Sequence, residues 1–387
     1  MSAEQYGARL LEEVQEQSLD KLRAELRNTI CPQPRAVLGV LQVDKLLEEA
    51  RFPNGAATTP HRPVWQSTAA DSPAFREGRS ESEDQDDPDT SPRRFVEAPK
   101  PKPATIELTS QKSASGKTTL LSHLIGISVL PKYLGGKEST AIYIDADGRF
   151  SAMRLAQLMH HYIHRHSKKP ATTSLSDVDM IIKESLDHIH VFRPQSSTQL
   201  LSILSHLPGY LFDASRHQSM HRPLSMIILD SATTFFWQDR FDRTMARLET
   251  PGTTIEGPST TQQVIERLKH LQERFDCVVL FSTTSTTPAS IPQRQVEVGP
   301  TTPAPEDTGR VISPWTAYAT LTLNLSRVPV PQFAPQMSME ECLRDRERRF
   351  EAVRKGRFVA VVISKREGER RAGGFGFAIT TDGVEIE

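Results

Sequence analysis

The stretch Gln111-Lys-Ser-Ala-Ser-Gly-Lys-Thr-Thr119 lies between a predicted strand at 104–109 and a predicted helix. A phosphate-binding loop follows the pattern G-x-x-x-x-G-K-[ST] in that setting. Its backbone N–H groups surround phosphates at the start of the helix, its lysine neutralises phosphate oxygens, and its hydroxyl ligates Mg²⁺. The second half of the pattern is intact at Gly116–Thr118, whereas Gln111 occupies the position of the first glycine. The stretch predicts a phosphate-binding loop, against the alternative of a helix that begins at a chance SGKT.

A second motif, Met226-Ile-Ile-Leu-Asp230, supplies an apolar strand that ends in a carboxylate. P-loop proteins use such an aspartate, together with the loop hydroxyl, to hold the Mg²⁺ of the bound nucleotide. Alone, this pattern is common in α/β proteins. Because it follows the phosphate-binding loop in the expected order, the pair predicts a nucleotide site for ATP and Mg²⁺.

A third motif, Tyr143-Ile-Asp-Ala-Asp147-Gly-Arg-Phe150, lies at the end of the strand that follows the phosphate-loop helix. Open α/β sheets place ligand-contacting groups at the carboxyl ends of their strands. A carboxylate at Asp147 would orient and polarise the water that attacks a γ-phosphate, while Asp145 would cap or brace the strand end. A turn built on Asp147 and Gly148 is the alternative, and it weighs equally on chemistry alone.

Strands and helices alternate from residue 104 onward, and this βαβ rhythm predicts a parallel sheet with helices on both faces. The run Ser225–Asp230 is apolar on both faces, as a central parallel strand requires. After Pro314 the pattern changes to strands alone, at 317–326, 358–364 and 375–380, which we expect to extend the sheet edge in antiparallel fashion. The other predicted strands are 104–109, 140–145, 189–192 and 277–282, and the predicted helices run to residue 130 and over 151–166, 197–207 and 261–275.

Composition excludes several classes of protein. The 387 residues carry 47 Lys+Arg against 48 Asp+Glu, a formal net charge of −1, which argues against a nucleic-acid binder that is basic along its whole length but allows a local basic patch. Cys31, Cys277 and Cys342 are too far apart in sequence for a disulfide scaffold or a cysteine zinc site, and they suit a reducing compartment. With neither a signal peptide nor an apolar stretch of membrane-spanning length, we expect a soluble intracellular protein without a membrane partner.

Proline and charge divide the chain into three parts. Residues 1–51 carry two short helical patterns that a Pro-Gln-Pro stretch separates. Residues 52–103 hold nine of the 27 prolines and the acidic run Glu81–Asp89, so we predict a disordered linker, with an acidic docking segment for a basic partner as the alternative. Residues 104–387 form the predicted nucleotide-binding domain.

Together these motifs resemble the eukaryotic RecA-type recombinases, and within that family the paralogues of the recombinase. The resemblance runs from about residue 104 to 387, and a weaker similarity is present near the N-terminus. It is carried by SGKTTLLSHLIGISVLP (Ser115–Pro131), IYIDADGRFSAMRL (Ile142–Leu155), MIILDSATTFFWQDR (Met226–Arg240) and FAITTDGVEI (Phe377–Ile386). The resemblance implies a RecA-like P-loop ATPase core, with a mostly parallel central sheet that antiparallel C-terminal strands extend.

The resemblance also implies roles for individual residues. Thr118 and Asp230 would hold the Mg²⁺, and Asp147 occupies the position of the catalytic carboxylate. The residues implied in nucleotide binding are Gln111, Lys112, Ser113, Ala114, Ser115, Gly116, Lys117, Thr118 and Thr119.

The chain departs from the family at several of these positions. The family carries glycine where this chain has Gln111 and Ala114, glutamate where it has Asp147, and an Asn-Gln pair where it has Ser282–Ser285. Catalysis by positioning is sensitive to such shifts, since a misplacement of ~1 Å can cost on the order of 10²-fold in rate. We therefore expect nucleotide binding with slow or absent hydrolysis.

The family places two mobile DNA-contacting loops after core strands, at positions that hold 242–260 and 283–313 in this chain. Both segments are rich in Thr, Pro and Gly, with few bases and no aromatic residue for stacking, so featureless surface loops weigh equally. Basic residues gather at Arg344–Arg357, where interleaved acids favour a salt-bridged exposed helix over a phosphate track. They also gather at 365–371, a predicted hairpin tip that could contact DNA or a neighbouring subunit.

We therefore expect a nucleotide-binding subunit of a recombinase-paralogue complex. By resemblance, it assists assembly of the recombinase filament during double-strand-break repair by homologous recombination. Its partners would be other recombinase paralogues, the recombinase itself and DNA through shared contacts, which implies the nucleus. Two alternatives stay open: an active DNA-dependent ATPase or recombinase, and a non-enzymatic scaffold with a vestigial nucleotide site.

One further pattern carries a possible metal site. His160 and His164 stand four residues apart on a predicted helix, as two zinc ligands do. No glutamate follows His160 and no third ligand lies nearby in the sequence. We expect solvated histidines there instead of zinc.

Overall fold

The computed structural model describes residues 37–52, 102–166, 175–249, 258–284, 313–330, 333–363 and 373–387. Outside these ranges lie the helical pattern predicted before residue 37, residues 53–101 of the linker predicted at 52–103, residues 250–257 of the first predicted loop, most of the second predicted loop and the basic segment at 365–371. What the sequence indicates for those segments stays a prediction.

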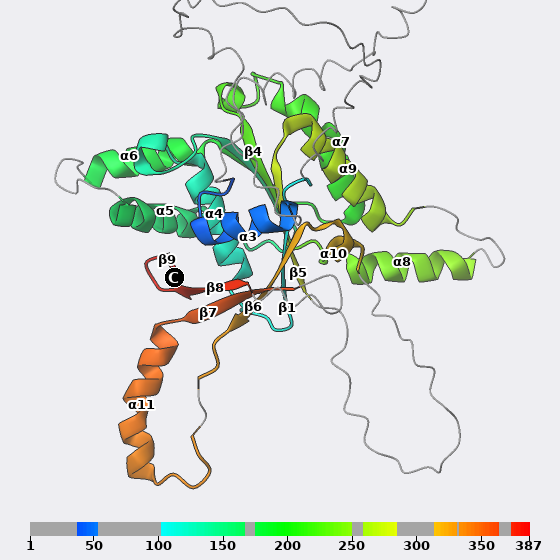
Figure 1. Ribbon diagram of the computed structural model, residues 1–387. Coiled ribbons are helices and arrows are strands. Elements are labelled where there is room, and N and C mark those ends of the chain that lie inside the picture. The colour runs from blue at the N-terminus through cyan, green and yellow to red at the C-terminus, as the bar shows by residue number, and fades with distance from the viewer. Residues whose placement is uncertain are drawn as a thin grey trace, which may run out of the picture.

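The described residues form nine strands and nine α-helices, drawn in Figure 1. The strands are β1 (Thr105–Ser110), β2 (Thr140–Asp145), β3 (Ile189–Phe192), β4 (Leu224–Asp230), β5 (Val278–Thr284), β6 (Leu321–Arg327), β7 (Arg357–Val362), β8 (Gly374–Ile379) and β9 (Val384–Ile386). The helices are α3 (Leu41–Arg51), α4 (Lys117–Val129), α5 (Ala152–His166), α6 (Leu175–Leu186), α7 (Ser197–Leu211), α8 (Phe236–Glu249), α9 (Thr260–Phe275), α10 (Pro314–Tyr318) and α11 (Met339–Arg354), with short 3₁₀ helices η2 (Lys132–Leu134) and η3 (Ser219–His221).

All these strands belong to one sheet, in the order β3-β2-β4-β5-β1-β6-β7-β8-β9. Neighbours from β3 to β6 run parallel, and β7, β8 and β9 continue the edge in antiparallel fashion. This confirms the predicted α/β class and agrees with the RecA-like core that the resemblance implies. One detail of the prediction is wrong: β6 is parallel to β1, with Ile106 opposite Leu321. β6 therefore begins at the same edge of the sheet as β1 and β5, so a long crossover connection follows β5.

Helices cover both faces of the sheet because the central strands are apolar on both sides. Met226 and Ile228 of β4 join the cluster beneath α3, α4, α5 and α6, whereas Ile227 and Leu229 join the cluster beneath α7, α9 and α10. Figure 1 shows the two groups of helices on opposite sides of the strands. The alternation of side chains along each strand thus produces a three-layer core.

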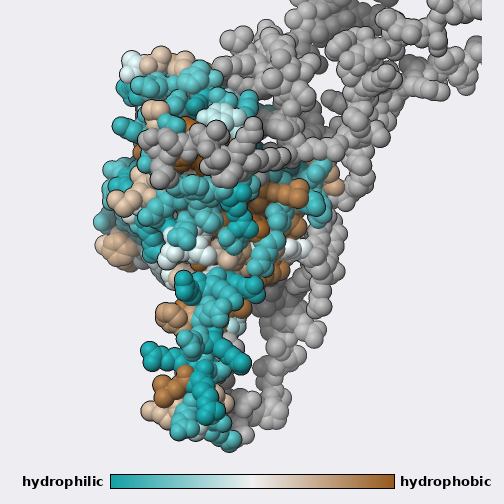
Figure 2. All heavy atoms as spheres, turned by 90° about the vertical axis from the view of Figure 1, so that its left-hand side faces the viewer, coloured by the Kyte–Doolittle hydropathy of each residue, from teal (hydrophilic) through white to brown (hydrophobic). Residues whose placement is uncertain are grey.

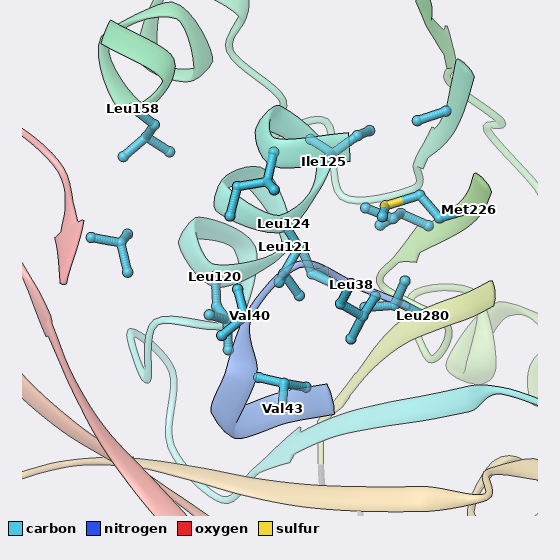
Figure 3. Packing of buried hydrophobic residues seen from close by; sticks show 14 of the residues in the cluster. Leu38, Val40, Val43, Leu120, Leu121, Leu124, Ile125, Leu158, Met226 and Leu280 are labelled. Carbon is cyan, nitrogen blue, oxygen red and sulfur yellow. The ribbon is translucent and has the colours of Figure 1, made fainter. Parts of the chain in front are cut away.

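Helix α3 is part of this core. Leu38, Val43 and Leu47 are almost completely buried, and in Figure 3 Leu38, Val40 and Val43 lie beside the leucines of α4. The Asp44 carboxylate accepts hydrogen bonds from the backbone N–H of Leu38 at 2.7 Å and of Gly39 at 3.0 Å, which fixes the turn that leads into the helix. The second of the two predicted N-terminal helical patterns therefore packs directly on the α/β core.

Several helices stand where strands or loops were predicted. Residues 317 and 318 belong to α10 instead of a strand, and 242–249 of the first predicted loop form the second half of α8. Apolar residues of α8 recur at helical spacing, and the Thr, Pro and Gly that suggested a loop follow Glu249. α11 interrupts the region predicted as strands alone, and α6 was not predicted.

The interleaved charges of the Arg344–Arg357 region did indicate α11. Its start is fixed by a capping box between Ser338 and Glu341, and ion pairs join residues four apart, including Arg349 to Asp345 at 3.0 Å. None of its residues is buried, and Figures 1 and 2 show it projecting from the body with a mainly hydrophilic surface. The prediction of an exposed, salt-bridged helix is confirmed.

The C-terminal strands form the support behind the phosphate-binding loop. Gly116 has a φ of 88°, in the left-handed region, and a Cβ added there would lie 2.9 Å from Ile379 Cδ1 and 3.3 Å from the Phe377 ring. This position favours glycine, because a side chain would be strained at that φ and its Cβ would have to displace the end of the Ile379 side chain of β8.

We predict that Gly116→Ala lowers the free energy of unfolding by about 2 kcal/mol, of which the left-handed φ accounts for about 1–2 kcal/mol and the contact with Ile379 for the remainder. Gly148→Ala is the matched control, since Gly148 has a φ of 70° with nothing within 4 Å of an added Cβ. Urea unfolding of both variants measures the difference. Equal losses would contradict a close packing of β8 against the loop.

A buried histidine makes stability depend on pH. His123 of α4 is 7% exposed, and its ring meets Tyr162 edge-on at 5.9 Å between centroids. Burial, aided by the positive charges that His166 and His161 can carry, lowers the pKa of His123 to about 4. The imidazole therefore stays neutral in the folded protein at pH values where it is protonated in the unfolded chain.

We predict that His123 destabilises the fold as pH falls from its unfolded pKa of about 6.5 towards 4, because only the unfolded state then gains a proton. The loss from this residue between pH 7 and pH 5 is about 2 kcal/mol. His123→Gln should reduce the pH dependence of urea unfolding by that amount, and His206→Gln, at an exposed histidine, should not. A variant with the parent's pH dependence would refute this origin.

Candidate functional site

The three sequence motifs meet at one edge of the sheet. Ser110, Asp145 and Asp230 end β1, β2 and β4, and these strands share one direction because each pairs in parallel with its neighbour. Open α/β sheets bind ligands at this carboxyl edge. The structure therefore brings the phosphate-binding loop, the Asp147 turn and the Asp230 strand end together.

Two loop residues, Ala114 and Gly116, have the positive φ angles that glycine adopts most easily. Gly116 is the N-cap of α4, so the unpaired N–H groups of the first helical turn face the loop, as phosphate binding requires. Ala114 has a φ of 56°, which costs a residue with a Cβ about 1–2 kcal/mol. The family's glycine at this position avoids that cost. Gln111–Ala114 are exposed and Ser115 is buried.

Lys117 lies inside the loop. Its ammonium donates to Ser110 Oγ, and to Ser115 Oγ at 3.5 Å. Partial burial lowers the pKa of Lys117, and the negative charges of Asp230 and Asp147 act in the opposite direction. The loop thus carries a partly desolvated cation, which attracts phosphate more strongly than an exposed one.

Thr118 and Asp230 are in direct contact. Thr118 Oγ1 donates to Asp230 Oδ2 at 2.8 Å, across 112 residues of sequence. A hydroxyl and a carboxylate are the oxygen ligands that Mg²⁺ prefers, and Mg²⁺ in nucleotide sites takes only one or two protein ligands besides phosphates and water. The two side chains therefore fit a Mg²⁺ ion bound together with a nucleotide.

Two further hydroxyls hold Asp230, and sequence reasoning missed both. Tyr143 OH donates to Asp230 Oδ2 at 2.9 Å, and Ser282 Oγ donates to Asp230 Oδ1. Burial, and then the charge of Asp230, raise the pKa of Tyr143 well above its usual value, so the phenol stays protonated and donates. Tyr143 is a polar side chain within an apolar predicted strand, and Ser282 ends another. Ser282 was noted from the sequence only as part of the position of the family's Asn-Gln pair, not as a partner of Asp230.

Asp145 braces the end of β2, one of the two roles considered for it. Its carboxylate accepts from the backbone N–H of Arg149 at 2.9 Å and of Phe150 at 3.1 Å, and from Arg193 Nε at 3.1 Å. The side chain is fully buried. Asp145 therefore fixes the turn that carries Asp147.

The Asp147 carboxylate has fewer hydrogen-bond partners than that of Asp145. Its Oδ1 accepts from Thr234 Oγ1 at 2.8 Å, and Arg149 Nε lies 3.7 Å from its Oδ2. Its backbone N–H donates to the carbonyl of Asp230 at 3.2 Å. Asp147 therefore lies in a turn next to Asp230, one of the two candidate Mg²⁺ ligands. This position is compatible both with a catalytic carboxylate and with a turn-forming aspartate.

A further buried carboxylate, Glu107, lies beneath the site. Glu107, in the middle of β1, accepts from Thr283 of β5 at 2.7 Å, Thr322 of β6 at 3.1 Å and Thr316 of α10 at 3.3 Å. Sequence reasoning did not single it out. The Glu107 cluster ties the strand that leads into the phosphate-binding loop to the strand that leads into the second predicted loop.

The structure does not bring other candidates to this site. The rings of His160 and His164 lie 4.6 Å apart on α5, and across the described ranges no group of three or more His, Cys, Asp or Glu side chains could hold a metal ion. Nor, within those ranges, is any helix long and apolar enough to cross a bilayer.

No protein-family model matches the chain. Among curated proteins, DNA repair protein XRCC2 of Mus musculus is 29% identical over 173 residues, which cover 44% of this chain and 52% of that protein. The DNA repair protein XRCC3 homolog of Arabidopsis thaliana is 26% identical over 172 residues (44% and 50%), and the DNA repair protein RAD51 homolog 3 of Dictyostelium discoideum is 27% identical over 124 residues (30% and 30%).

The matches thus span about half the length of the first two relatives and less than a third of the other. They support a relationship with the RAD51 paralogues, the branch that the motifs resemble. The sequence resemblance to the recombinase paralogues is confirmed at this level.

We predict that Tyr143→Phe lowers the free energy of unfolding by about 1.5–3 kcal/mol, because a buried hydrogen bond to a charged carboxylate is lost. Tyr133→Phe, at a tyrosine that is 75% exposed, should change it by less than about 0.5 kcal/mol. Urea unfolding measures both variants. Similar small effects in the two would show that Tyr143 does not support Asp230.

Proposed function

We propose that this chain, a relative of the RAD51 paralogues, is an ATP-binding subunit of a recombinase-paralogue complex that acts in DNA repair by homologous recombination. The observation that carries the proposal is the contact between Thr118 and Asp230, beside the Lys117 loop. This is the hydroxyl and carboxylate pair that a Mg²⁺-bound nucleotide needs. The names of the relatives, all of them DNA repair proteins, support the biological setting.

In this proposal each residue has a defined task. The N–H groups at the start of α4 and the Lys117 ammonium bind the phosphates of ATP, and Gln111–Thr119 supply the loop around them. Thr118 and Asp230 hold Mg²⁺, which would neutralise charge that develops on the phosphates. Tyr143 and Ser282 hold the Asp230 carboxylate in place, so the metal ligand is set before the nucleotide arrives.

Hydrolysis is proposed to be weak. The γ-phosphate needs a water that a carboxylate positions, and the Asp147 side chain is one methylene shorter than the family's glutamate and is bonded to Thr234. The polar end of β5 holds Ser282 and Thr283, whose hydroxyls donate hydrogen bonds to Asp230 and Glu107, respectively. Neither is then available to sense the phosphate in place of the family's Asn-Gln pair.

The partners are proposed by relationship. They are other recombinase paralogues and the recombinase, whose filament the complex would help to assemble at double-strand breaks. DNA contact would be shared with those subunits, in the nucleus. The exposed α8 and α11 leave surface for such partners, while the candidate DNA loops lie mostly outside the described residues.

We predict that Lys117→Ala weakens ATP binding at least 10-fold, since a charge-assisted contact to phosphate is lost. Lys132→Ala, which changes an exposed lysine on η2, should leave ATP binding unchanged.

Asp147→Glu should raise the slow ATP turnover at least 10-fold, and Asp147→Asn should not. Fluorescent-nucleotide titration and phosphate release measure the two effects.

Co-purification with recombinase paralogues, with and without ATP, completes the test. The proposal expects ATP-dependent assembly that Lys117→Ala weakens. Fast turnover in the parent protein, abolished by Lys117→Ala, would indicate an active ATPase or recombinase instead. If Lys117→Ala changes neither ATP binding nor assembly, the protein is a scaffold with a vestigial site.

A further inference from the structure

A pocket of about 260 Å³ lies at the opposite end of the parallel strands from the nucleotide site. Thr140 and Leu224, the first residues of β2 and β4, form part of its lining. Since Asp145 and Asp230 end the same two strands and a strand rises about 3.3 Å per residue, roughly 17–20 Å separates the pocket from the Mg²⁺ candidates. The pocket is therefore independent of the nucleotide site.

Three connections enclose this pocket. The end of α7 contributes Leu211 and Phe212, the end of α9 contributes Arg274–Asp276, and the segment around η3 contributes His217 and Ser219–Pro223. In Figure 1, α7 and α9 lie side by side on one face of the sheet. Their C-terminal ends and the entry into β4 thus supply walls from three separate segments.

The pocket lining contains two arginines, Arg222 and Arg274, and one carboxylate, Asp276. Arg222 is half-buried, and its Nη1 donates to the carbonyl of Val129 at the end of α4, at 3.0 Å. Its Nε is buried and has no hydrogen-bond partner among the described residues. A guanidinium has five N–H donors in a planar fork, so most of the donors of Arg222 remain for an acceptor in the pocket.

The second guanidinium is held by aromatic rings. The Arg274 Cζ lies 5.5 Å from the centre of the Phe212 ring and 5.9 Å from that of Phe275, and the two rings are 5.8 Å apart. Cation–π contacts of this kind hold the guanidinium against the two rings. The Arg274 fork is thus positioned in the same wall as an exposed aromatic face, since Phe212 is 42% exposed.

A buried hydrogen-bond network fixes the segment that carries Arg222. Ser219 Oγ bonds to His188 Nδ1 at 2.9 Å and to His190 Nε2 at 3.1 Å, and Tyr210 OH bonds to His190 Nδ1 at 3.0 Å. This network supports the pocket from behind, so that Arg222 is presented from a rigid turn.

We propose that this pocket binds a small phosphomonoester with an aromatic body. Planar guanidinium forks recognise phosphate by pairs of parallel hydrogen bonds, and Arg222 and Arg274 reach the pocket from two different walls. The apolar lining, with the exposed rim of Phe212 and Met220, takes the aromatic part. The ligand class follows from both halves together: phosphate for the guanidiniums, a flat ring for the rim.

Phenyl phosphate tests this proposal, with inorganic phosphate and phenol as probes for each half of the pocket. The full chain with Lys117→Ala is used, so that the phosphate-binding loop does not contribute. Calorimetric titration should show phenyl phosphate binding at least 10-fold more tightly than either inorganic phosphate or phenol. Arg222→Gln and Arg274→Gln should each weaken phenyl phosphate binding at least 10-fold.

The matched control is Arg216→Gln. Arg216 lies in the same α7–β4 connection, pairs with Asp213 at 3.1 Å and is largely exposed, and it does not line the pocket; phenyl phosphate should bind this variant as it binds its parent. Circular dichroism melting checks that each variant is folded, and either arginine variant alone suffices. The proposal is overturned if Lys117→Ala abolishes all phenyl phosphate binding, or if a folded Arg222→Gln or Arg274→Gln variant binds phenyl phosphate as tightly as its parent. It is also overturned if phenol binds as tightly as phenyl phosphate.

Discussion

The candidate nucleotide site depends on one buried carboxylate and the three hydroxyls that donate to it. Asp230 ends β4 at 2% exposure, where an unpaired charge would be costly. Thr118, Tyr143 and Ser282 come from α4, β2 and β5 and converge on its two oxygens. Each bond thus also joins two elements of the core, so the metal candidate cannot shift unless the packing of α4 on the sheet shifts with it. Beneath it, Glu107 joins β1, β5, β6 and α10 through threonine hydroxyls in the same manner.

Much of this arrangement follows from local patterns. The strands at 140–145 and 189–192 match β2 and β3 end to end, because each is a short apolar run between clear turn signals. Lys117, Thr118 and Asp230 were selected by residue type and order, because phosphate and Mg²⁺ chemistry restrict which residues serve. Their role stays a prediction, and the structure places Thr118 in contact with Asp230. The helix layers on both faces then follow from the rule that parallel strands need crossover connections.

What the sequence did not reveal depends on long-range contacts. Tyr143 and Ser282 look like minor interruptions of apolar strands, and only the pairing of β2, β4 and β5 shows that both face Asp230. The direction of β6 was misjudged because a short α10 and a long connection precede it, and neither fixes a direction locally. α8 was partly taken for a loop because its helical spacing merges into a stretch rich in Thr, Pro and Gly. The Arg222 and Arg274 pocket carries no sequence motif at all.

The packing of Ile379 and Phe377 behind Gly116 has a consequence for how the protein is made. The phosphate-binding loop is synthesised long before β8, the strand that supports it from behind. Such contacts between distant parts of a chain form late and slowly, because the intervening segment must first be ordered. A ribosome-bound chain that has released α4 and β4 but not β8 therefore holds every residue of the Lys117, Thr118 and Asp230 group without the finished loop. The complete phosphate-binding loop therefore requires that β8 has been synthesised and has packed behind Gly116.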